Sequence, residues 1–432
     1  MSRDPVVIIG AGLAGLSAAA TLFEMGVEFI LLEAEGKVGG LCRTERAGDF
    51  LFDHTGHLLH LKEGPVREFV LDRIGDLLVM HKRRASVYVE GIYVPYPIQA
   101  NFGKLSPPTV KRCIETFRMA GEKPIVNDPD FVQWSTAQFG EGLSELFMIP
   151  YNRKLFVHPI EELETSWTSW SVPRPGVDDM ERAASGEDTG SFGYNVDFYY
   201  PSGGGIDVLP EKLAGGTGDS IRLNSRVTAV DPVAKTVTVG KKEVVGYRNL
   251  ISTMPLSVLA ETISGAEVSL KRAAGYLRCS SVLALCLGLD GPVPMSEHWI
   301  YFPEESFPFY RVGFPTNFSD SVAPEGCGSM YIEIAHMPGE DHDKEKLSDN
   351  VLCALWDAGV ISADVNILAS LFIPIPCAYV FYDRYRKKNI KRILSELASH
   401  SILSVGRYGA WEYSSMQDAI AWGLKAGREV TA

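Results

Sequence analysis

The sequence predicts an α/β fold in which one domain, built on a parallel sheet, is assembled from separate stretches of chain and holds two inserted domains. Three observations predict it. Residues 6–34 read as a strand, a glycine-rich turn, a helix and a second strand. Residues 404–423 show a strand, turn and helix again near the end of the chain. Between them, helical patterns over residues 108–156 precede strand-like runs over residues 281–375.

The first element carries a nucleotide-binding pattern. VVIIGAGLAG, residues 6–15, places Gly10, Gly12 and Gly15 in GxGxxG spacing, and the next strand ends in Glu33. Gly10 permits the tight turn, Gly12 lets the backbone approach a pyrophosphate, and Gly15 allows the helix to pack closely on the strand. The helix N-terminus adds a positive dipole end, and the Glu33 carboxylate can accept hydrogen bonds from a ribose. These residues predict a Rossmann-like dinucleotide-binding domain.

The following segment favours FAD over NAD as the dinucleotide. GKVGGLCRT, residues 36–44, brings Gly39, Gly40 and Leu41 just behind the acidic residue, with Arg43 close by. Such a loop lets the chain cross a second nucleotide face closely, and a plain glycine turn is the alternative. The arrangement resembles the flavoproteins that include amine oxidases, phytoene desaturases and sugar mutases, in which this loop lies along FAD. FAD is therefore the expected cofactor.

The remaining elements follow from turn residues and periodicity. A hairpin is expected at residues 86–97, with Glu90 and Gly91 at its turn. The strands at residues 220–240 and 247–255 are expected to extend the first sheet. Helices are expected within residues 108–121, 130–138, 141–156 and 199–216.

These elements divide the chain into three domains. The FAD-binding domain is expected to be discontinuous and to comprise residues 1–85, 203–265 and 400–432. A mostly helical substrate domain with mobile loops, residues 86–202, and an antiparallel sheet domain, residues 266–399, are inserted into it. A chain of 432 residues is long enough for two or three packed domains.

The composition excludes several function classes. The formal net charge is −13, which argues against a nucleic-acid or anionic-membrane partner, so any anionic ligand must be held by locally placed arginines. The seven cysteines show no CxxC or other metal-ligand spacing, so we expect no metal and a reducing, cytoplasmic compartment. No apolar run reaches the roughly 18 residues that span a bilayer. The start of the chain lacks the basic region of a signal peptide.

Seven stretches together carry a family resemblance. They are TGHLLH (55–60), YVPYPIQAN (93–101), LFMIPYNRKLF (146–156), YYPSGGG (199–205), LISTMPLSVLAE (250–261), WIYFPEESFPFYR (299–311) and GRYGAWEY (406–413). Their joint order and spacing resemble the UDP-galactopyranose mutase family, and its eukaryotic branch more than its bacterial one. The resemblance runs over nearly the whole chain.

The resemblance implies a flavin-dependent isomerase. Such enzymes interconvert the pyranose and furanose forms of a nucleotide-diphosphate sugar, as between the galactopyranose and galactofuranose forms of UDP-galactose. The FAD must be reduced, with NADPH or NADH as external reductant, although the overall reaction is redox-neutral. In the implied mechanism, flavin N5 attacks the anomeric carbon and the diphosphate leaves. The sugar of the adduct then opens and recloses through the other hydroxyl before the diphosphate returns.

Three residues are assigned by the resemblance to the catalytic centre. His57, in TGHLLH, matches a histidine beside flavin N5, and a buried core histidine is the alternative. Arg311, in FPFYRVG, is awkward as a core residue among aromatic neighbours and sensible as a fork for the diphosphate. An arginine in solvent at a strand end is its alternative. Tyr413 is expected to project into the substrate cavity.

The resemblance also implies residues that bind the substrate. Phenolic hydroxyls can hydrogen-bond phosphate without adding charge, aromatic rings can stack on a base, and amides can read its polar edge. Phe156 stands where a tryptophan is expected, which keeps a stacking face and loses the indole N–H. Asn195 matches an asparagine on a loop that closes over the substrate. The expected substrate residues are Tyr96, Gln99, Phe147, Asn152, Phe156, Arg174, Asn195, Tyr301 and Tyr379.

One position departs from the family pattern. The family carries a second arginine on the mobile loop that grips the diphosphate, and Ser171 occupies that position here. It opens residues 171–193, which are rich in glycine, proline and serine and are expected to form a mobile loop. The lost contact is worth about 1.5–3 kcal/mol. Three alternatives follow: Arg174 substitutes, the substrate is not UDP-galactose, or the chemistry has diverged.

The segment near the C-terminus is expected to lie against the flavin. Gly406 would let the cofactor approach, and Arg407 would pack beside it. Ser414 or Ser415 is the expected N-cap of the helix that follows. The free N–H groups at its start, at Met416, would face the electron-rich edge of reduced flavin. A plain C-terminal helix is the alternative.

Two other function classes stay open. An FAD-dependent oxidase or desaturase of the amine oxidase superfamily shares the front-end pattern, but it would not need Arg311 and the tyrosines. A flavin- or nucleotide-binding regulatory protein is the non-enzymatic alternative. The expected partner is a nucleotide-diphosphate sugar, and a homo-oligomer is left open.

Overall fold

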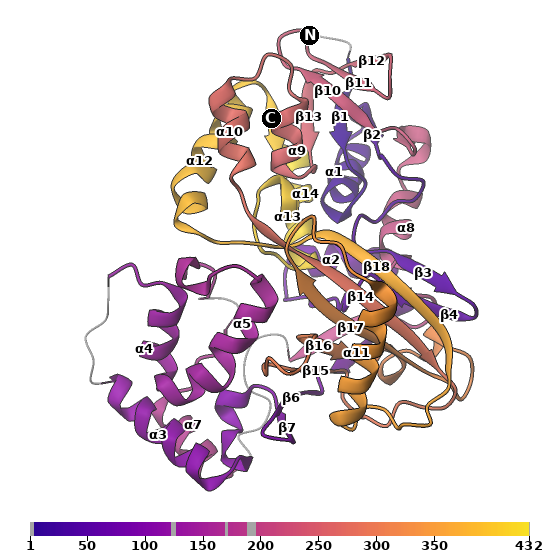
Figure 1. Cartoon of the computed structure of the whole chain (residues 1–432). Helices are drawn as coiled ribbons and strands as arrows, with labels where there is room; N and C mark the ends of the chain where they lie inside the picture. The colour runs from indigo at the N-terminus through magenta and orange to yellow at the C-terminus, as the bar shows by residue number, and fades with distance from the viewer. Residues whose placement is uncertain (1–3, 122–126, 169–171, 188–195, 432) are drawn as a thin grey trace.

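A five-stranded parallel sheet forms the centre of the upper part of the molecule in Figure 1. The computed structural model describes residues 4–121, 127–168, 172–187 and 196–431. The strand order is β19-β13-β1-β2-β9, so both ends and the middle of the chain contribute strands. This confirms the predicted discontinuous α/β domain. The strands are β1 (Val6–Ile9), β2 (Phe29–Leu32), β9 (Ile221–Arg222), β13 (Asn249–Ser252) and β19 (Ile402–Ser404).

Helix α14 (Met416–Glu429) packs tightly along α1 (Leu13–Glu24). A Cβ atom added at Gly423 would come within 2.2 Å of the Ala14 carbonyl oxygen, so only glycine permits this approach. The contact fixes the start of α14 beside the start of α1. The other helices of this part of the molecule are α2 (Pro65–Ile74), α8 (Val208–Gly215), α9 (Leu256–Thr262), α10 (Val268–Gly275), α12 (Arg384–Ser399) and α13 (Gly406–Gly409).

Three small antiparallel units accompany the parallel sheet. The expectation that residues 220–240 extend the parallel sheet is correct only for β9, because most of this segment turns back on itself as a separate three-stranded sheet. Residues 247–255 do add β13 beside β1. The units are β10 (Val227–Asp231), β11 (Thr236–Val239) and β12 (Glu243–Gly246); β3 (Thr44–Ala47) and β4 (Phe50–Asp53); and β5 (Leu78–Lys82) and β8 (Asp197–Pro201).

A seven-stranded sheet with the order β18-β14-β17-β16-β15-β6-β7 lies at the lower right of Figure 1. Its neighbouring strands run antiparallel except for β15 and β6, which are parallel. Helix α11 (Lys344–Asp357) covers one face, and its Leu355 is buried against Leu285 and Phe302. The strands are β6 (Ala85–Val89), β7 (Ile92–Pro95), β14 (Cys279–Leu289), β15 (Trp299–Tyr301), β16 (Arg311–Gly313), β17 (Gly328–His336) and β18 (Ile367–Val380).

Two predicted domain boundaries need correction. The hairpin of β6 and β7 forms with Glu90 (φ +53°) and Gly91 (φ +74°) at its turn, as expected. It nevertheless joins the seven-stranded sheet, so residue 86 does not begin the helical domain. Helices α10 and α12 pack together beside the parallel sheet, so residues 266–399 are divided between two domains. Both errors arise because these pairings join residues that are far apart in the chain.

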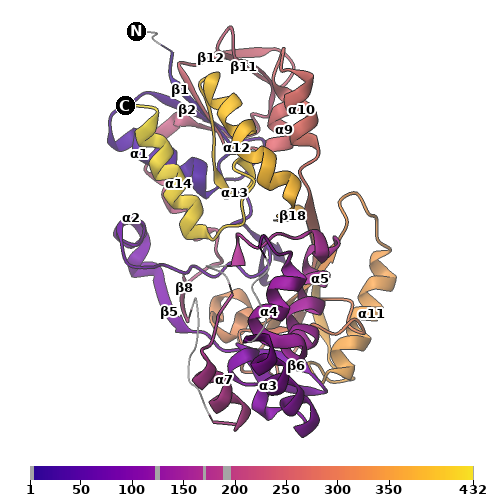
Figure 2. The ribbon, with the colours of Figure 1, turned by 90° about the vertical axis from the view of Figure 1, so that its left-hand side faces the viewer.

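The helical domain faces the viewer at the lower part of Figure 2. Asp130 caps α4 by accepting a hydrogen bond from Gln133 N at 2.8 Å. Residues 171–193 were expected to form a loop throughout, but α7 lies within them, with two aspartates in its first turn that favour the helix dipole. The helices are α3 (Pro107–Gly121), α4 (Phe131–Leu143), a π-helical turn (Ser144–Met148), α5 (Ile149–Phe156) and α7 (Val177–Ala184).

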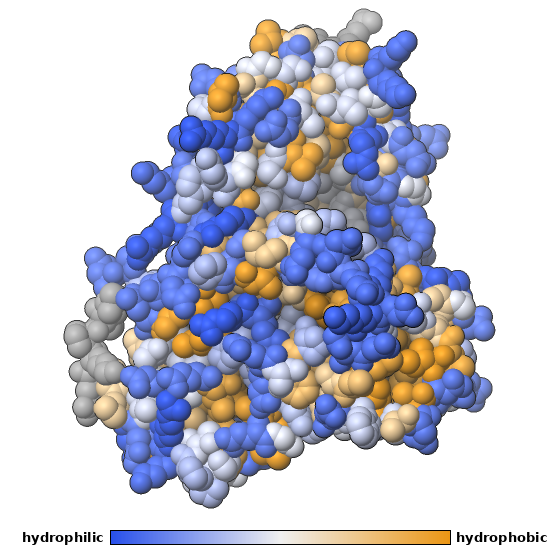
Figure 3. Space-filling model, viewed as in Figure 1, coloured by the Kyte–Doolittle hydropathy of each residue, from blue (hydrophilic) through white to orange (hydrophobic). Residues whose placement is uncertain are grey.

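Hydrophilic residues cover most of the face seen in Figure 3, and hydrophobic side chains gather over the seven-stranded sheet at its lower right. Leu368 of β18 is among the exposed large hydrophobic residues, with 51% of its surface accessible. Within the described residues, every helix is too short or too polar to cross a membrane.

Candidate active site

A cavity of about 930 Å³ lies where the carboxyl ends of the parallel strands meet the seven-stranded sheet. Ligands of open α/β sheets bind at this edge. The cavity brings together expected residues from the first hundred residues of the chain and from residues 301–416. Those that line it are Gly10, Gly12, Glu33, Gly39, Gly40, Leu41, His57, Tyr96, Tyr301, Arg311, Tyr379, Gly406, Arg407, Tyr413, Ser415 and Met416.

The first wall of the cavity is mostly main chain. Gly10 has φ +97°, and a Cβ there would come within 2.3 Å of Thr253 Oγ1. Gly12 precedes α1 and lies beside Gly39 in a β-bridge, so two glycine loops meet at the helix start. The Glu33 carboxylate accepts hydrogen bonds from Ala11 N at 2.7 Å and from Glu35 N at 2.9 Å. Gly15 does not line the cavity.

Gly15 instead packs the helix on the strand, as predicted. A Cβ at this position would lie 1.9 Å from the Gly10 carbonyl oxygen. The close approach holds the start of α1 over the end of β1, where the first N–H groups of the helix lack intrahelical partners.

The C-terminal segment, residues 406–416, forms the rest of this wall. Gly406 has φ +86°, and Arg407 is held by three hydrogen bonds, two to the Ala378 carbonyl oxygen (3.2 and 2.6 Å) and one to that of Ser414 (2.7 Å). Ser415, rather than Ser414, is the N-cap of α14. It forms a capping box with Asp418, in which Ser415 Oγ accepts from Asp418 N at 3.2 Å.

His57 lies at the junction of this wall and the sheet. Burial, together with the nearby His54 and Arg407, lowers the pKa of His57 to about 3, so the ring is neutral at physiological pH. Thr55, at φ +72°, turns the chain so that His57 N donates to the Thr55 carbonyl oxygen at 3.0 Å. His57 is therefore a neutral hydrogen-bonding group in the cavity.

The residues of this wall fit the expected dinucleotide. Three of its polar side-chain atoms are buried without a hydrogen-bond partner among the described residues: His57 Nδ1, Tyr408 Oη and Ser414 Oγ. All three residues line the cavity. Because buried polar groups in folded proteins are almost always paired, these atoms indicate a polar ligand at this wall. The glycine loops, the start of α1 and Glu33 supply the surfaces that a pyrophosphate and a ribose require.

Tyrosine rings form the other wall. Tyr96 and Tyr301 lie with ring centroids 5.0 Å apart, and Tyr379 stacks on Tyr413 at 5.7 Å. Burial raises the pKa of Tyr96, Tyr301 and Tyr379. These phenols therefore stay protonated and can donate hydrogen bonds without adding charge.

Arg311 lines this wall and forms an ion pair with Glu333. It begins β16 and stands directly opposite Glu333 of β17. The pair is bidentate, with Arg311 Nε donating to Glu333 Oε2 at 3.0 Å and Nη2 donating to Oε1 at 2.6 Å. Burial would lower the pKa of Arg311, but the fully buried Glu333 carboxylate raises it, so the guanidinium keeps its charge.

Sequence reasoning missed Glu333, which is fully buried and pairs with Arg311 without lining the cavity, and it missed several residues that do line it. The signal for Glu333 is a single acid within the apolar strand GSMYIEIAH, since a fully buried carboxylate needs a partner. The partner depends on the strand register, which the sequence does not give. The missed residues that line the cavity include His60, Arg83, Tyr310 and Tyr331.

The residues expected around the nucleoside do not line the cavity. Phe147 stacks on Tyr151 at 5.2 Å and meets Tyr301 edge-on at 6.3 Å. Phe156 packs against Trp167, with ring centroids 5.7 Å apart.

The two expected amides each donate to a backbone carbonyl oxygen. Asn152 Nδ2 donates to that of Met148 at 2.7 Å, and Gln99 Nε2 donates to that of Pro173 at 3.0 Å, while Gln99 Oε1 is buried without a partner among the described residues. Both side chains are buried outside the cavity, and their assignment to the nucleoside stays a prediction.

Arg174 also lies away from the cavity. It is exposed, donates to Thr168 Oγ1 at 3.2 Å and lies over the Trp134 ring at 5.2 Å. Ser171 and Asn195 are outside the described residues. The expected second arginine contact is therefore not part of this cavity.

Comparison with known proteins extends these observations. The chain matches the model of the flavin containing amine oxidoreductases over residues 13–358. An L-amino-acid oxidase of Bothrops moojeni is 22% identical over 99% of this chain and 89% of that protein. A structure of putrescine oxidase is 16% identical with a TM-score of 0.66, covering 99% of both chains, which shows a common fold.

The structure of a reduced UDP-galactopyranose mutase is more similar. It is 28% identical, with a TM-score of 0.94, and the match covers 100% of this chain and 94% of that one. This confirms the resemblance inferred from the seven sequence stretches, and with it the expectation of a mutase-like enzyme of the isomerase class. The family match spans most of the chain and includes both sides of the cavity. The chain belongs to the family of flavin-containing amine oxidoreductases.

Proposed function

We propose that this protein is a flavin-dependent mutase that interconverts the pyranose and furanose forms of a nucleotide-diphosphate sugar, with UDP-galactose as the reference substrate and galactofuranose as the rearranged sugar. One observation carries the proposal. The partly buried Arg311 and the hydroxyl-bearing rings of Tyr96, Tyr301 and Tyr379 line the same cavity as the glycine-lined dinucleotide wall. Oxidation of an amine or a polyene needs no such set of phosphate-binding groups.

The dinucleotide wall would hold FAD. Gly10, Gly12 and Gly39 leave room for the pyrophosphate, and Glu33 lies where it can reach a ribose hydroxyl. Arg407 and the start of α14 would lie at the flavin end of the cofactor. When bound and reduced, by NADPH or NADH, FAD supplies the nucleophile that replaces the diphosphate at the anomeric carbon.

Arg311 would stabilise the charge that develops as the diphosphate leaves. Its two bonds to Glu333 use Nε and Nη2, so Nη1 is the atom available to a phosphate oxygen. Glu333 fixes the plane of the guanidinium before the substrate arrives, and a preorganised donor of this kind is the usual source of electrostatic catalysis. The phenol hydroxyls of Tyr301, Tyr379 and Tyr413 would donate further hydrogen bonds to the phosphates or sugar.

His57 would position rather than transfer a proton at neutral pH. Its pKa of about 3 keeps the ring neutral, and its buried Nδ1 is available to a ligand atom in the cavity. A neutral imidazole at the flavin end would not add positive charge beside Arg407.

The nucleoside would bind beside Tyr301, at the surface of the helical domain. Phe147 and Phe156 remain the proposed stacking rings, and Gln99 and Asn152 the proposed amides, with Asn195 as the proposed closing residue. Binding there requires these side chains to leave their present packing contacts. We also infer a cytoplasmic location, because the seven cysteines are free thiols.

One experiment tests the proposal. The purified protein is reduced with dithionite or with NADPH under nitrogen and incubated with a panel of UDP-, GDP- and dTDP-sugars, and the products are separated by chromatography. A pyranose–furanose shift that needs reduced flavin and consumes no stoichiometric reductant is the expected result. Peroxide formation from an amine or amino acid under air, without any sugar conversion, would instead identify an oxidase like the curated relatives.

A further inference from the structure

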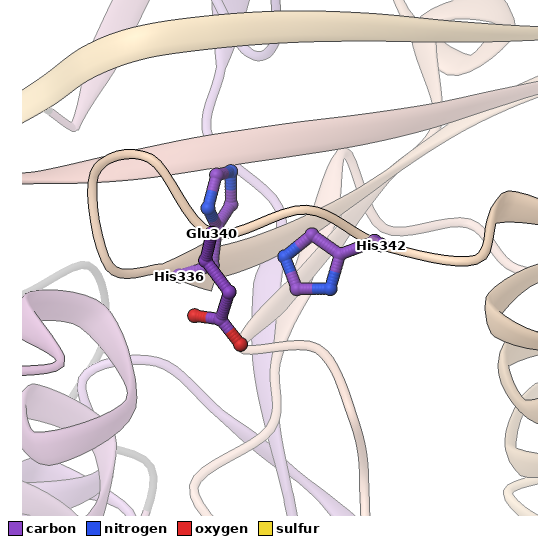
Figure 4. Close-up of side chains that lie close together, drawn as sticks. All are labelled: His336, Glu340 and His342. Carbon is purple, nitrogen blue, oxygen red and sulfur yellow. The ribbon is translucent and has the colours of Figure 1, made fainter.

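The loop between β17 and α11 brings three potential metal ligands together. Among the residues that the structure describes, His336, Glu340 and His342 each offer one ligand atom, and these atoms lie within 4.8 Å of one another. Figure 4 shows the imidazole of His342 pointing toward the other two side chains. The two imidazole rings stand edge to face, with centroids 4.7 Å apart. None of the three lines the active-site cavity.

The backbone of this loop is fixed by a tight turn. Glu340 N donates to the Met337 carbonyl oxygen at 3.1 Å, with Pro338 second in the turn and Gly339 third, at φ +83°. This is the geometry and sequence of a type II turn. It folds Glu340 back toward His336. At the other end of the loop, Asp343 caps α11 by accepting from Lys346 N at 3.2 Å.

Hydrogen bonds within the loop also orient the ligand atoms. His336 Nδ1 lies 3.0 Å from the Met337 carbonyl oxygen, which makes Nδ1 the donor and leaves Nε2 with a lone pair. Glu340 Oε2 accepts from Met337 N at 3.1 Å, which leaves Oε1 for another contact. His342 Nε2 is buried and has no hydrogen-bond partner within the described residues. Ligands of bound metals are held by such secondary hydrogen bonds.

We propose that His336, Glu340 and His342 bind a divalent transition-metal ion, with Zn²⁺ as the reference ion. Two imidazoles and one carboxylate are a ligand set that suits zinc, and three protein ligands leave a fourth position open to water or to another molecule. Tetrahedral Zn²⁺ with bonds of about 2.1 Å places its ligands about 3.4 Å apart. The three ligand atoms, which lie within 4.8 Å of one another, would have to move closer by up to about 1.4 Å, and the exposed side chain of Glu340 can turn toward the imidazoles.

The electrostatics of the loop favour a cation. The exposed Asp341, Asp343 and Glu345 outnumber the exposed Lys344 and Lys346 beside the three ligands, and the whole chain has a formal net charge of −13. These acidic side chains raise the local concentration of cations, but they are not part of the proposed ligand set. Mutations can therefore test the three ligands separately from the acidic residues around them.

Co²⁺ titration of the full-length, tag-free protein tests the proposal, because visible absorption of Co²⁺ reports its ligand geometry. We expect one Co²⁺ per chain with intense bands of a four-coordinate site, displaced by equimolar Zn²⁺. His336→Ala, His342→Ala and Glu340→Gln should each weaken binding at least about tenfold, since removing even a group that orients a ligand typically costs that much. Sulfur-to-cobalt charge-transfer bands would show that cysteines bind the ion instead, and would overturn the proposal.

Two control variants sharpen the result. Glu345→Gln removes the same charge as Glu340→Gln from the same acidic surface, and His400→Ala removes an exposed histidine far along the chain. Both should bind Co²⁺ as the unaltered protein does. Equal binding by Glu340→Gln and Glu345→Gln, or absence of binding by the unaltered protein up to millimolar Co²⁺, would overturn the proposal. Thermal unfolding of each variant shows whether it is folded.

Discussion

The two walls of the cavity are built from different parts of the peptide. The dinucleotide wall consists of backbone at Gly10, Gly12 and Gly406, and of helix starts held by close packing. The opposite wall consists of side chains from the seven-stranded sheet, chiefly Arg311 and the tyrosines. The glycines of the first wall lack side chains, so a large ligand can approach the backbone there, whereas the second wall depends on which side chains face each other across strands.

The difference predicts how each wall responds to mutation. At Gly12, where an added Cβ would meet no protein atom closer than 3.8 Å, adding atoms to the backbone wall should expel the cofactor without harming the fold. Removing atoms from the side-chain wall should harm both the reaction and the fold, since its groups are buried in mutual contacts such as that of Arg311 with Glu333.

The largest effect is expected for Gly12→Ala. Gly12 has φ −73°, and a Cβ there would lie 3.8 Å from its nearest neighbour, Gly40 Cα, so the protein itself accepts alanine. The added methyl group would occupy the path of the pyrophosphate. We expect a folded, colourless protein without detectable mutase activity, measured by flavin absorbance and circular dichroism. Gly121→Ala, at a site with no close neighbour, should keep the yellow colour of bound flavin. A Gly12→Ala variant that binds flavin fully would show that the pyrophosphate does not need a glycine at this position.

Arg311→Ala should lower kcat/KM about 10–100-fold, because a charge-assisted hydrogen bond is worth about 1.5–3 kcal/mol. It should also reduce the free energy of unfolding by about 3–5 kcal/mol, since the fully buried Glu333 loses its partner. Steady-state kinetics and urea denaturation measure the two effects.

A double variant separates them. Arg311→Ala with Glu333→Gln removes the unpaired charge, so it should recover part of the stability and none of the activity. Recovery of activity in the double variant would show that Arg311 acts only through the fold.

His57→Gln tests the residue that lies where the two walls meet. The pKa of His57 is lowered from 6.5 to about 3, so below pH 6.5 the unfolded chain takes up a proton that the folded chain does not. Stability contributed by the neutral ring is therefore lost as the pH falls. Between pH 7 and pH 5 this group should lower the free energy of unfolding by about 2 kcal/mol, and His57→Gln should not show this decrease. Urea denaturation at both pH values measures the difference, which the exposed His400→Gln should leave unchanged.

The smallest effect is expected for Arg174→Ala. The side chain is exposed and donates a hydrogen bond to Thr168 Oγ1 at 3.2 Å. An exposed contact of this kind is worth less than about 1 kcal/mol, so kcat/KM should change by less than about threefold. A fall of tenfold or more would mean that Arg174 reaches the diphosphate when substrate is bound, and that the side-chain wall extends into the helical domain.

Features that depend on neighbouring residues could be predicted from the sequence. The glycine turn at Gly10–Gly15 and the cap at Ser415 each rest on residues a few positions apart, and the structure has them as expected. Backbone geometry at short range is set by local sterics and hydrogen bonds, so the sequence alone carries it.

Features that depend on distant pairing could not be predicted. Glu333 meets Arg311 only through the register of β16 on β17, and β6 joins β15 across some two hundred residues. Helix α7 was not predicted, because the glycine, serine and proline residues around it in the sequence indicate a loop. The residues assigned to the nucleoside pack inside the helical domain, because buried aromatic rings there have closer partners than the cavity.

The contact between α1 and α14 has a consequence for how the dinucleotide wall forms. Gly423 packs against Ala14, which lies some four hundred residues earlier in the chain, and Gly406 and Arg407 line the same wall as Gly10 and Gly12. No short N-terminal fragment therefore contains the whole wall. Binding of a ligand there is coupled to folding of distant segments together, so a ligand that fills the wall should raise the temperature of unfolding.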